Sequence, residues 1–200
     1  MVDAPILVRL RDRDAAVVDA WRRHFRGVQA VEIGFGDIFA VAADAIVSPA
    51  NSFGYMDGGI DAVYLERFGA GLQWRLQERL RERHGGELVV GEAVIVETGA
   101  SELRWLVSAP TMRVPGPVKD TLNAYLAFRA ALRAVLAHNE AGLPRIASVL
   151  CPGLASAIGA MPPERVARQM RFAYDVTLGG RPWPPLRAAE IHETHRELLR

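Results

Sequence analysis

Short apolar runs rich in branched residues alternate along the chain with segments whose apolar residues recur at helical spacing. The runs predict buried strands at residues 5–10, 28–33, 45–47, 92–97, 103–108 and 146–150. The helical spacing predicts helices at residues 12–25, 61–68, 72–83, 122–137, 162–174 and 187–199. Because Pro5 opens the first strand and proline cannot donate to a strand ladder, we expect this strand at an edge of its sheet.

The order of these elements predicts a three-layer α/β/α sandwich with a mixed, mainly parallel central sheet. We assign residues 1–178 to this domain. From Gly179 onward, glycines and prolines surround Trp183 and a short helix follows, so residues 179–200 are predicted to form a peripheral C-terminal extension. In such sheets ligands bind beyond the carboxyl ends of the strands, and the loops at these ends are therefore the candidates for a site.

Composition narrows the classes of function. The net charge of +1, from 24 basic and 23 acidic residues, does not favour a nucleic acid as a partner of the whole surface. Cys151 is the only cysteine, which excludes an internal disulfide and favours a reducing, cytoplasmic location. No apolar run approaches the ~18–20 residues of a membrane helix, so we expect no membrane partner.

A first candidate loop follows the strand predicted at residues 45–47. It contains Asn51, Asp57 and a glycine pair at 58–59 before a helix begins. A strand, a glycine-bearing loop and a helix in this order allow backbone N–H groups to converge on an anion. Asn51 can bond hydroxyl groups, and Asp57 or Asp61 could act as a base. An exposed connection in which Asp61 only caps the next helix accounts for the same residues.

A second candidate loop, of small residues, spans 151–161 after the strand predicted at 146–150. It is similar to a phosphate cradle but matches neither the Walker pattern nor GxGxxG, and ordinary close packing accounts for it equally well. Cys151 is interpreted as a small buried hydrophobic residue. His192 and His195 are interpreted as part of a solvated helix, so we predict no metal site and no cofactor.

The chain also contains, in order, GDI at residues 36–38, DAIVSPAN at 44–51, GGID at 58–61, GEA at 91–93 and the small-residue loop at 156–159. Together and at this spacing, these segments resemble a macro domain, the α/β/α module that binds ADP-ribose. The likeness covers roughly residues 31–174, most of the chain.

The resemblance implies roles for the matching positions. Asp37 would accept a hydrogen bond from the adenine amino group, and Asn51 would face the distal ribose. Asp61 lies near the aspartate that directs water at the distal ribose in hydrolytic members, so the implied catalytic residues are Asn51, Asp61 and the additional acid Asp57. Ligand contacts are implied for Asp37, Ile38, Asn51, Gly58, Gly59, Ile60, Ser156, Ala157, Ile158 and Gly159.

The function implied by the resemblance is recognition of ADP-ribose or a related nucleotide. In a hydrolytic member, it would extend to removal of mono-ADP-ribose from a protein or nucleic acid. A third interpretation, a different enzyme that acts on another nucleotide metabolite, is indicated by Asp57 and by the loop at residues 115–117, which could form part of a cleft wall.

Several positions depart from the family pattern. Ser48 and Pro49 replace an asparagine and an alanine, and Ala155 and Ala157 stand in a loop that commonly reads Ser/Thr-Gly. An alanine costs on the order of 1 kcal/mol where φ must be positive. The two alanines and the proline-rich tail around Trp183 favour the main alternative, a macro-fold structural or interaction module that has lost ADP-ribose binding.

Overall fold

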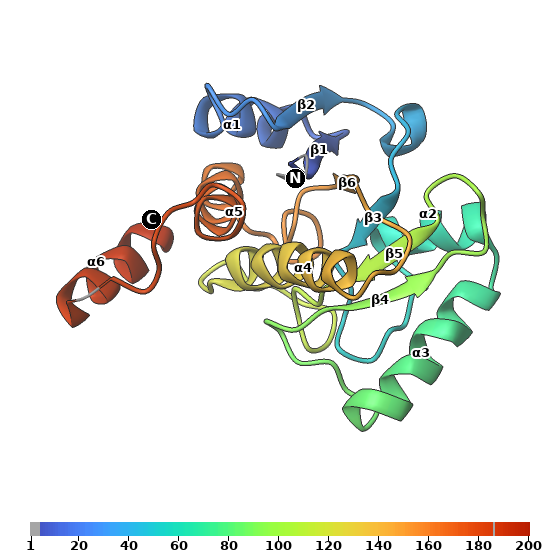
Figure 1. Ribbon diagram of the computed structural model, residues 1–200. Coiled ribbons are helices and arrows are strands. Elements are labelled where there is room, and N and C mark those ends of the chain that lie inside the picture. Colours follow the sequence, from blue (N-terminus) through green and yellow to red (C-terminus); the bar gives the residue numbers. More distant parts are fainter. Residues whose placement is uncertain (1–4, 186) are drawn as a thin grey trace.

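The computed structural model describes residues 5–185 and 187–200 and has a six-stranded sheet at its centre (Figure 1). The strands are β1 (Leu7–Asp12), β2 (Val31–Phe35), β3 (Ala45–Ser48), β4 (Val94–Glu97), β5 (Trp105–Ser108) and β6 (Ser148–Cys151). Their order is β2-β1-β6-β3-β5-β4, and every neighbouring pair is parallel except β4 and β5. The mixed, mostly parallel sheet confirms the predicted fold class.

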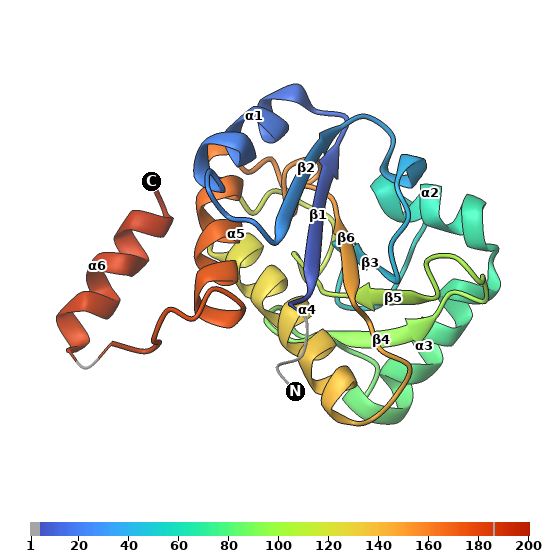
Figure 2. The same ribbon diagram turned by 45° about the horizontal axis from the view of Figure 1, so that its top comes forward.

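Helices cover both faces of the sheet. They are α1 (Ala15–His24), α2 (Gly59–Phe68), α3 (Gly71–His84), α4 (Asn123–Glu140), α5 (Pro163–Thr177) and α6 (Ala188–Leu198), with a 3-10 turn η1 (Ile38–Ala40) after β2. α1, α4 and α5 share one apolar core with the sheet, and α2 and α3 share another on the opposite face (Figure 2). Two cores on either side of a sheet make the three-layer sandwich.

The position of β1 corrects the prediction of an edge strand, which was wrong. β1 lies between β2 and β6 and pairs with both, and Val8 and Leu10 are fully buried. Pro5 precedes the strand, which begins at Leu7 with a hydrogen bond from the Leu7 N–H to the Ala147 carbonyl (2.9 Å). The missing N–H of proline therefore removes nothing from the ladder.

β3 and β6 meet along a seam that is closed at one end and open at the other. At the closed end, one carboxylate oxygen of Asp44 accepts from the N–H groups of Ala147 and Ser148 (2.8 Å each) and from the Ser148 hydroxyl (2.9 Å). The ladder then includes only the pairs Ala45↔Val149 and Ile46↔Leu150. Beyond this point β3 remains paired with β5, so β3 and β6 separate toward their carboxyl ends.

The extension beyond residue 178 lies against α5, away from α2 and α3 (Figures 1 and 2). Trp183 packs edge-on against Phe172, with ring centroids 5.0 Å apart. Leu198 is the buried residue of α6, and its carbonyl accepts a hydrogen bond from the Gln169 side chain (3.0 Å). No helix among residues 5–185 and 187–200 is long and apolar enough to cross a membrane.

Candidate functional site

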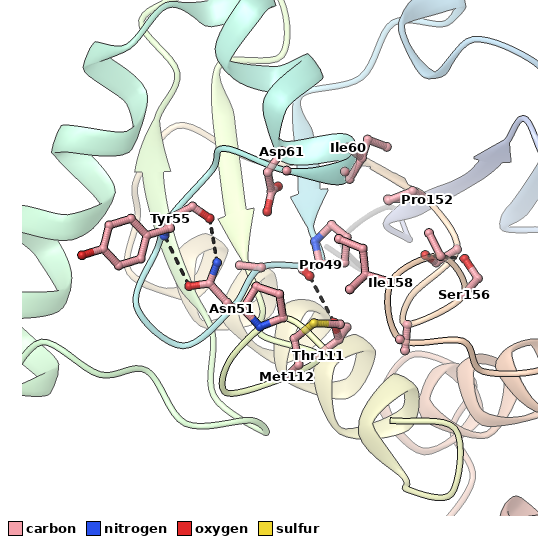
Figure 3. Close-up of a pocket in the computed structure, with 18 of the residues that line it drawn as sticks. Pro49, Asn51, Tyr55, Ile60, Asp61, Thr111, Met112, Pro152, Ser156 and Ile158 are labelled. Carbon is pink, nitrogen blue, oxygen red and sulfur yellow. Dashed lines mark hydrogen bonds between the residues drawn. The ribbon is translucent and has the colours of Figure 1, made fainter. Parts of the chain in front are cut away.

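A cavity of about 250 Å³ opens where β3 and β6 separate. It is lined by residues 49–51, 57–61, 111–112, 152–153 and 155–159, with Asp12, Asp14, Tyr55 and Pro115. The structure thus brings together the two loops predicted from sequence, which are about a hundred positions apart in the chain. Figure 3 shows Asn51 and Tyr55 at one end, Pro152 and Ser156 at the other, and Asp61 between them.

The first loop ends in the N-terminus of α2, which has no side-chain cap. The first hydrogen bond within the helix joins the Ala62 N–H to the Gly58 carbonyl (3.3 Å). The N–H groups of Gly59, Ile60 and Asp61 therefore have no partner inside the helix and carry its positive end. Gly59 has a φ of +56°, which favours glycine, and a Cβ there would make an ordinary contact of 3.4 Å with the Ile158 side chain of the second loop.

The second loop is held in a tight turn by its own backbone. Ala155 accepts from the Met161 N–H (3.0 Å), and Ala157 accepts from the Ala160 N–H (2.9 Å). A Cβ on Gly159 would lie 2.5 Å from the Ala155 carbonyl oxygen, so only glycine fits there. Within the described part of the chain, the N–H groups of residues 156–159 donate to no protein acceptor, and they remain available to a ligand.

Ala155 and Ala157, the two alanines at which the loop departs from the family pattern, differ in backbone conformation. Ala155 has a φ of +61°, whereas Ala157 is not in the left-handed region. Because an alanine with a positive φ is strained, Ala155 costs on the order of 1 kcal/mol of stability and Ala157 does not. Ala160, which the sequence interpretation did not single out, also has a positive φ, +52°.

Asp61 is the buried ionisable group of the cavity. Only 7% of the residue is exposed, and one carboxylate oxygen accepts from the Ser48 hydroxyl at 2.6 Å. Burial raises the pKa of Asp61 from 3.8 to about 7, partly opposed by the hydrogen bond from Ser48, which lowers it. The carboxyl is therefore present in both protonation states near neutral pH, as general base chemistry requires. It lies in the first turn of α2 and does not cap the helix, since Gly58 is the N-cap.

Asn51 organises its own loop. Its side-chain oxygen accepts from the N–H groups of Phe53 (3.0 Å) and Tyr55 (3.3 Å), and its amide nitrogen donates to the Tyr55 carbonyl (2.7 Å). Both lone pairs of the oxygen and one of the two N–H groups are thus used. One N–H of the Asn51 amide remains for a ligand.

Asp37 and Ile38 lie outside the cavity lining, so the adenine contact implied for Asp37 and the ligand contact implied for Ile38 stay predictions. Asp37 accepts from the Phe39 N–H (3.0 Å) and from the Arg13 guanidinium (2.5 Å). These two contacts, first the Phe39 N–H and then Arg13, hold its pKa below the usual value. Ile38 is buried.

Asp12 and Asp14 line the cavity, although the sequence interpretation considered them only as caps of the first helix. Asp14 is indeed the N-cap of α1, accepting from the Ala16 N–H (2.8 Å). Asp12 accepts from the N–H groups of Asp14 and Gly153 (2.8 Å each), which joins the end of β1 to the second loop. Their position at the end of a strand was the sequence signal that they could reach the site. This signal was missed because the strand was expected at an edge of the sheet, away from the two loops.

The charge of the lining is acidic. Asp12, Asp14, Asp57 and Asp61 contribute carboxyl groups, and no Lys, Arg or His belongs to the lining within the described chain. An anion bound here would therefore depend on the backbone N–H groups of the two loops. Pro115 forms part of the wall, as the sequence indicated for its loop.

The side chains interpreted as structural do not line the cavity. Burial raises the pKa of the Cys151 thiol well above its usual value, which fits an inert buried residue. His192 and His195 are exposed on α6. Across residues 5–185 and 187–200, no cluster of three or more His, Cys, Asp or Glu is arranged to hold a metal ion.

Fold and cavity together define an α/β/α module with a cleft at the carboxyl ends of its strands, lined by two loops. A family model described as the macro domain matches residues 47–170. The chain therefore belongs to the macro domain family, which confirms the resemblance inferred from its motifs.

Similar sequences and structures extend this result. An uncharacterised protein of Aeropyrum pernix is 34% identical over 158 residues, 79% of this chain and 76% of that protein. One from Aquifex aeolicus is 35% identical over 141 residues, 70% of this chain and 78% of its own length.

Among solved structures, the match to a macrodomain variant of Oceanobacillus iheyensis with ADP-ribose has a TM-score of 0.60, with 20% identity and coverage of 82% and 88%. The macrodomain of Mycobacterium tuberculosis DarG has a TM-score of 0.58, with 23% identity and coverage of 72% and 88%. These structures share the fold of this chain.

Proposed function

We propose that this chain binds ADP-ribose in the cavity between β3 and β6. The observation that carries the proposal is that two segments with unpaired backbone N–H groups, the N-terminus of α2 and residues 156–159, line the same cavity. Such groups suit a diphosphate in a lining without cationic side chains. The structural neighbour from Oceanobacillus iheyensis was solved with ADP-ribose, which supports the same ligand here.

The arrangement of the cavity suggests how the ligand lies. With the diphosphate between the two loops, the distal ribose falls beside Asn51 and Asp61, and the nucleoside extends toward Asp12 and Asp14. The remaining N–H of Asn51 would then donate to a ribose hydroxyl.

Isothermal titration calorimetry with ADP-ribose tests binding. Gly159→Ala places a methyl group against the Ala155 carbonyl and should reduce affinity at least tenfold, about 1.4 kcal/mol. Gly116→Ala is the matched control, because a Cβ there meets nothing within 4 Å. If millimolar ADP-ribose produces no heat and no thermal shift with the wild-type chain, the chain does not bind this ligand.

We further propose hydrolysis of mono-ADP-ribosylated macromolecules in the cytoplasm. Water would attack the anomeric carbon of the distal ribose while Asp61 takes a proton from that water. The bond between this carbon and the acceptor would break, and the acceptor would leave with the proton that Asp61 then gives up. Support comes from the position of Asp61 on the cavity wall and from its pKa of about 7, which allows it to accept a proton near neutral pH.

Turnover of a mono-ADP-ribosylated protein tests this step. Asp61→Asn should lower kcat by roughly 10²–10⁴-fold, the usual contribution of a general base. Asp57 lies exposed at the rim, and Asp57→Asn should lower kcat less than Asp61→Asn does. The reverse order would assign the base to Asp57, and equal wild-type and Asp61→Asn rates would refute the mechanism.

A second candidate, an interaction module without ADP-ribose binding, is favoured by the strained Ala155 and by the Asn51 amide, which is largely used within its loop. The double change Ala155→Gly and Ala157→Gly separates the two functions. Binding gained only in this variant would support the interaction module, whereas binding by the wild type supports a ligand site.

A further inference from the structure

Ser48 is the last residue of β3 and lies directly beneath the cavity. It is fully buried and absent from the lining, so it has no access to a bound ligand. Its carbonyl accepts from the Ala109 N–H (3.0 Å), which continues the pairing of β3 with β5 and fixes its backbone. Any effect of Ser48 on chemistry must therefore pass through a neighbouring side chain.

That neighbour is Asp61. The Ser48 hydroxyl donates to Asp61 Oδ1 at 2.6 Å, and this is the hydrogen bond of the Asp61 carboxyl found in the described chain. Tyr64, one helical turn further along α2, donates its hydroxyl hydrogen bond to the Val47 carbonyl (3.1 Å), so it does not compete with Ser48 for the Asp61 carboxylate. With Oδ1 held from below, Oδ2 is left for the cavity, toward which the carboxyl points in Figure 3.

The surroundings of Asp61 make this contact decisive. The titratable groups that act on Tyr64, one turn along the same helix, are Asp61 itself, Cys151 and Asp12, and the other carboxyl groups of the cavity lining are Asp14 and Asp57. None of these is cationic. Burial and Ser48 are the two influences on the Asp61 pKa, and they act in opposite directions. The Ser48 hydroxyl is thus the group that stabilises the ionised carboxylate.

We propose that Ser48 is a positioning residue for Asp61: its hydroxyl orients the carboxylate toward the cavity and favours the form that can accept a proton from water. This role rests on the hydrolase function proposed above, and it concerns a position at which the chain departs from the family pattern. Ser48 itself neither attacks the substrate nor exchanges a proton with it.

Ser48→Ala removes the donor without adding volume, and the chain offers a matched control in Ser108. Ser108 is the register partner of Ser48 on β5, is equally buried, and has a hydroxyl without a hydrogen-bond partner in the described chain. Ser108→Ala therefore repeats the chemical change on the same face of the sheet and leaves Asp61 untouched.

The first measurement is a pH titration of the Asp61 carboxyl by carbon-detected NMR in the full chain. Ser48→Ala should raise the Asp61 pKa above about 7 by roughly one to two pH units, the effect of losing a hydrogen bond to a charged group. Ser108→Ala should leave the pKa at the wild-type value. An unchanged pKa in Ser48→Ala, or an equal rise in both variants, would overturn the proposal.

The second measurement is the pH profile of kcat on a mono-ADP-ribosylated protein. In Ser48→Ala the rising limb of the kcat profile should move to higher pH by the same one to two units, which lowers kcat at pH 7 roughly 5- to 50-fold with KM unchanged. A uniform loss at every pH would indicate a structural role and refute the proposal. If no protein turns over while the NMR shift is seen, the hydrolase function fails and the control of Asp61 by Ser48 stands.

Discussion

The burial of Asp61 makes the stability of this protein depend on pH in a direction opposite to that of most aspartates. A salt-bridged aspartate has a lowered pKa and stabilises a fold above its titration range. The pKa of Asp61 is raised, so the folded state holds the proton more tightly than the unfolded chain does. Its contribution is fully present below pH 3.8 and is lost as the pH rises through about 7.

The size of this effect follows from the two pKa values. Each pH unit between 3.8 and about 7 corresponds to about 1.36 kcal/mol, so wild-type protein should lose roughly 4 kcal/mol from this group between pH 4 and pH 8. Asp61→Asn keeps the shape and an acceptor for Ser48 but cannot ionise. We expect the two proteins to be similar near pH 4, and the variant to be more stable by up to about 4 kcal/mol at pH 8.

Urea unfolding at several pH values between 4 and 8 measures the difference in unfolding free energy. Taking the difference between wild type and Asp61→Asn removes the contribution of all other titrating groups. Asp57→Asn, a change of the exposed carboxyl at the same rim, should run parallel to wild type. A constant difference between wild type and Asp61→Asn across this range would refute the raised pKa and with it the argument for a base.

Four further substitutions test the loops and the extension. Ala155→Gly should raise the unfolding free energy by up to about 1 kcal/mol because φ is +61° there, whereas Ala157→Gly should lower it; thermal denaturation that ranks them the other way would contradict the strain argument. Asn51→Ala removes three hydrogen bonds of its loop and should cost about 1–3 kcal/mol in urea unfolding, together with a rise in the Kd for ADP-ribose. Leu198→Ala should release α6, seen as faster hydrogen exchange in residues 188–198 alone; faster exchange throughout α5 as well would show that α6 belongs to the core.

Much of the fold could be predicted from the sequence because each element carries its own periodicity. Branched apolar runs gave the strands and helical spacing gave the helices, and the two loops after β3 and β6 were recognised from small residues at strand ends. The order of strands in the sheet could not be obtained in this way. It depends on pairings between distant segments, such as β1 with β6, and Pro5 suggested an edge that the chain does not use.

The same limitation applied to the site. The motif pointed to Asn51 and Asp61 as candidate site residues, but it did not predict the hydrogen bonds that their side chains make in the folded protein. Ser48 was noticed only as a departure, since its contact with Asp61 needs the first turn of α2 to fold back over the end of β3. Asp12 and Asp14 line the cavity because β1 lies inside the sheet, between β2 and β6.

The open end of the β3–β6 seam has a mechanical consequence. The sheet consists of two three-stranded blocks, β2-β1-β6 and β3-β5-β4, joined by two residue pairs and by the Asp44 clamp at one end only. A molecule that bonds both loops would act as a brace across this joint, closing the end that the backbone leaves apart. The same contacts that recognise a ligand would then lock the two halves of the sheet together.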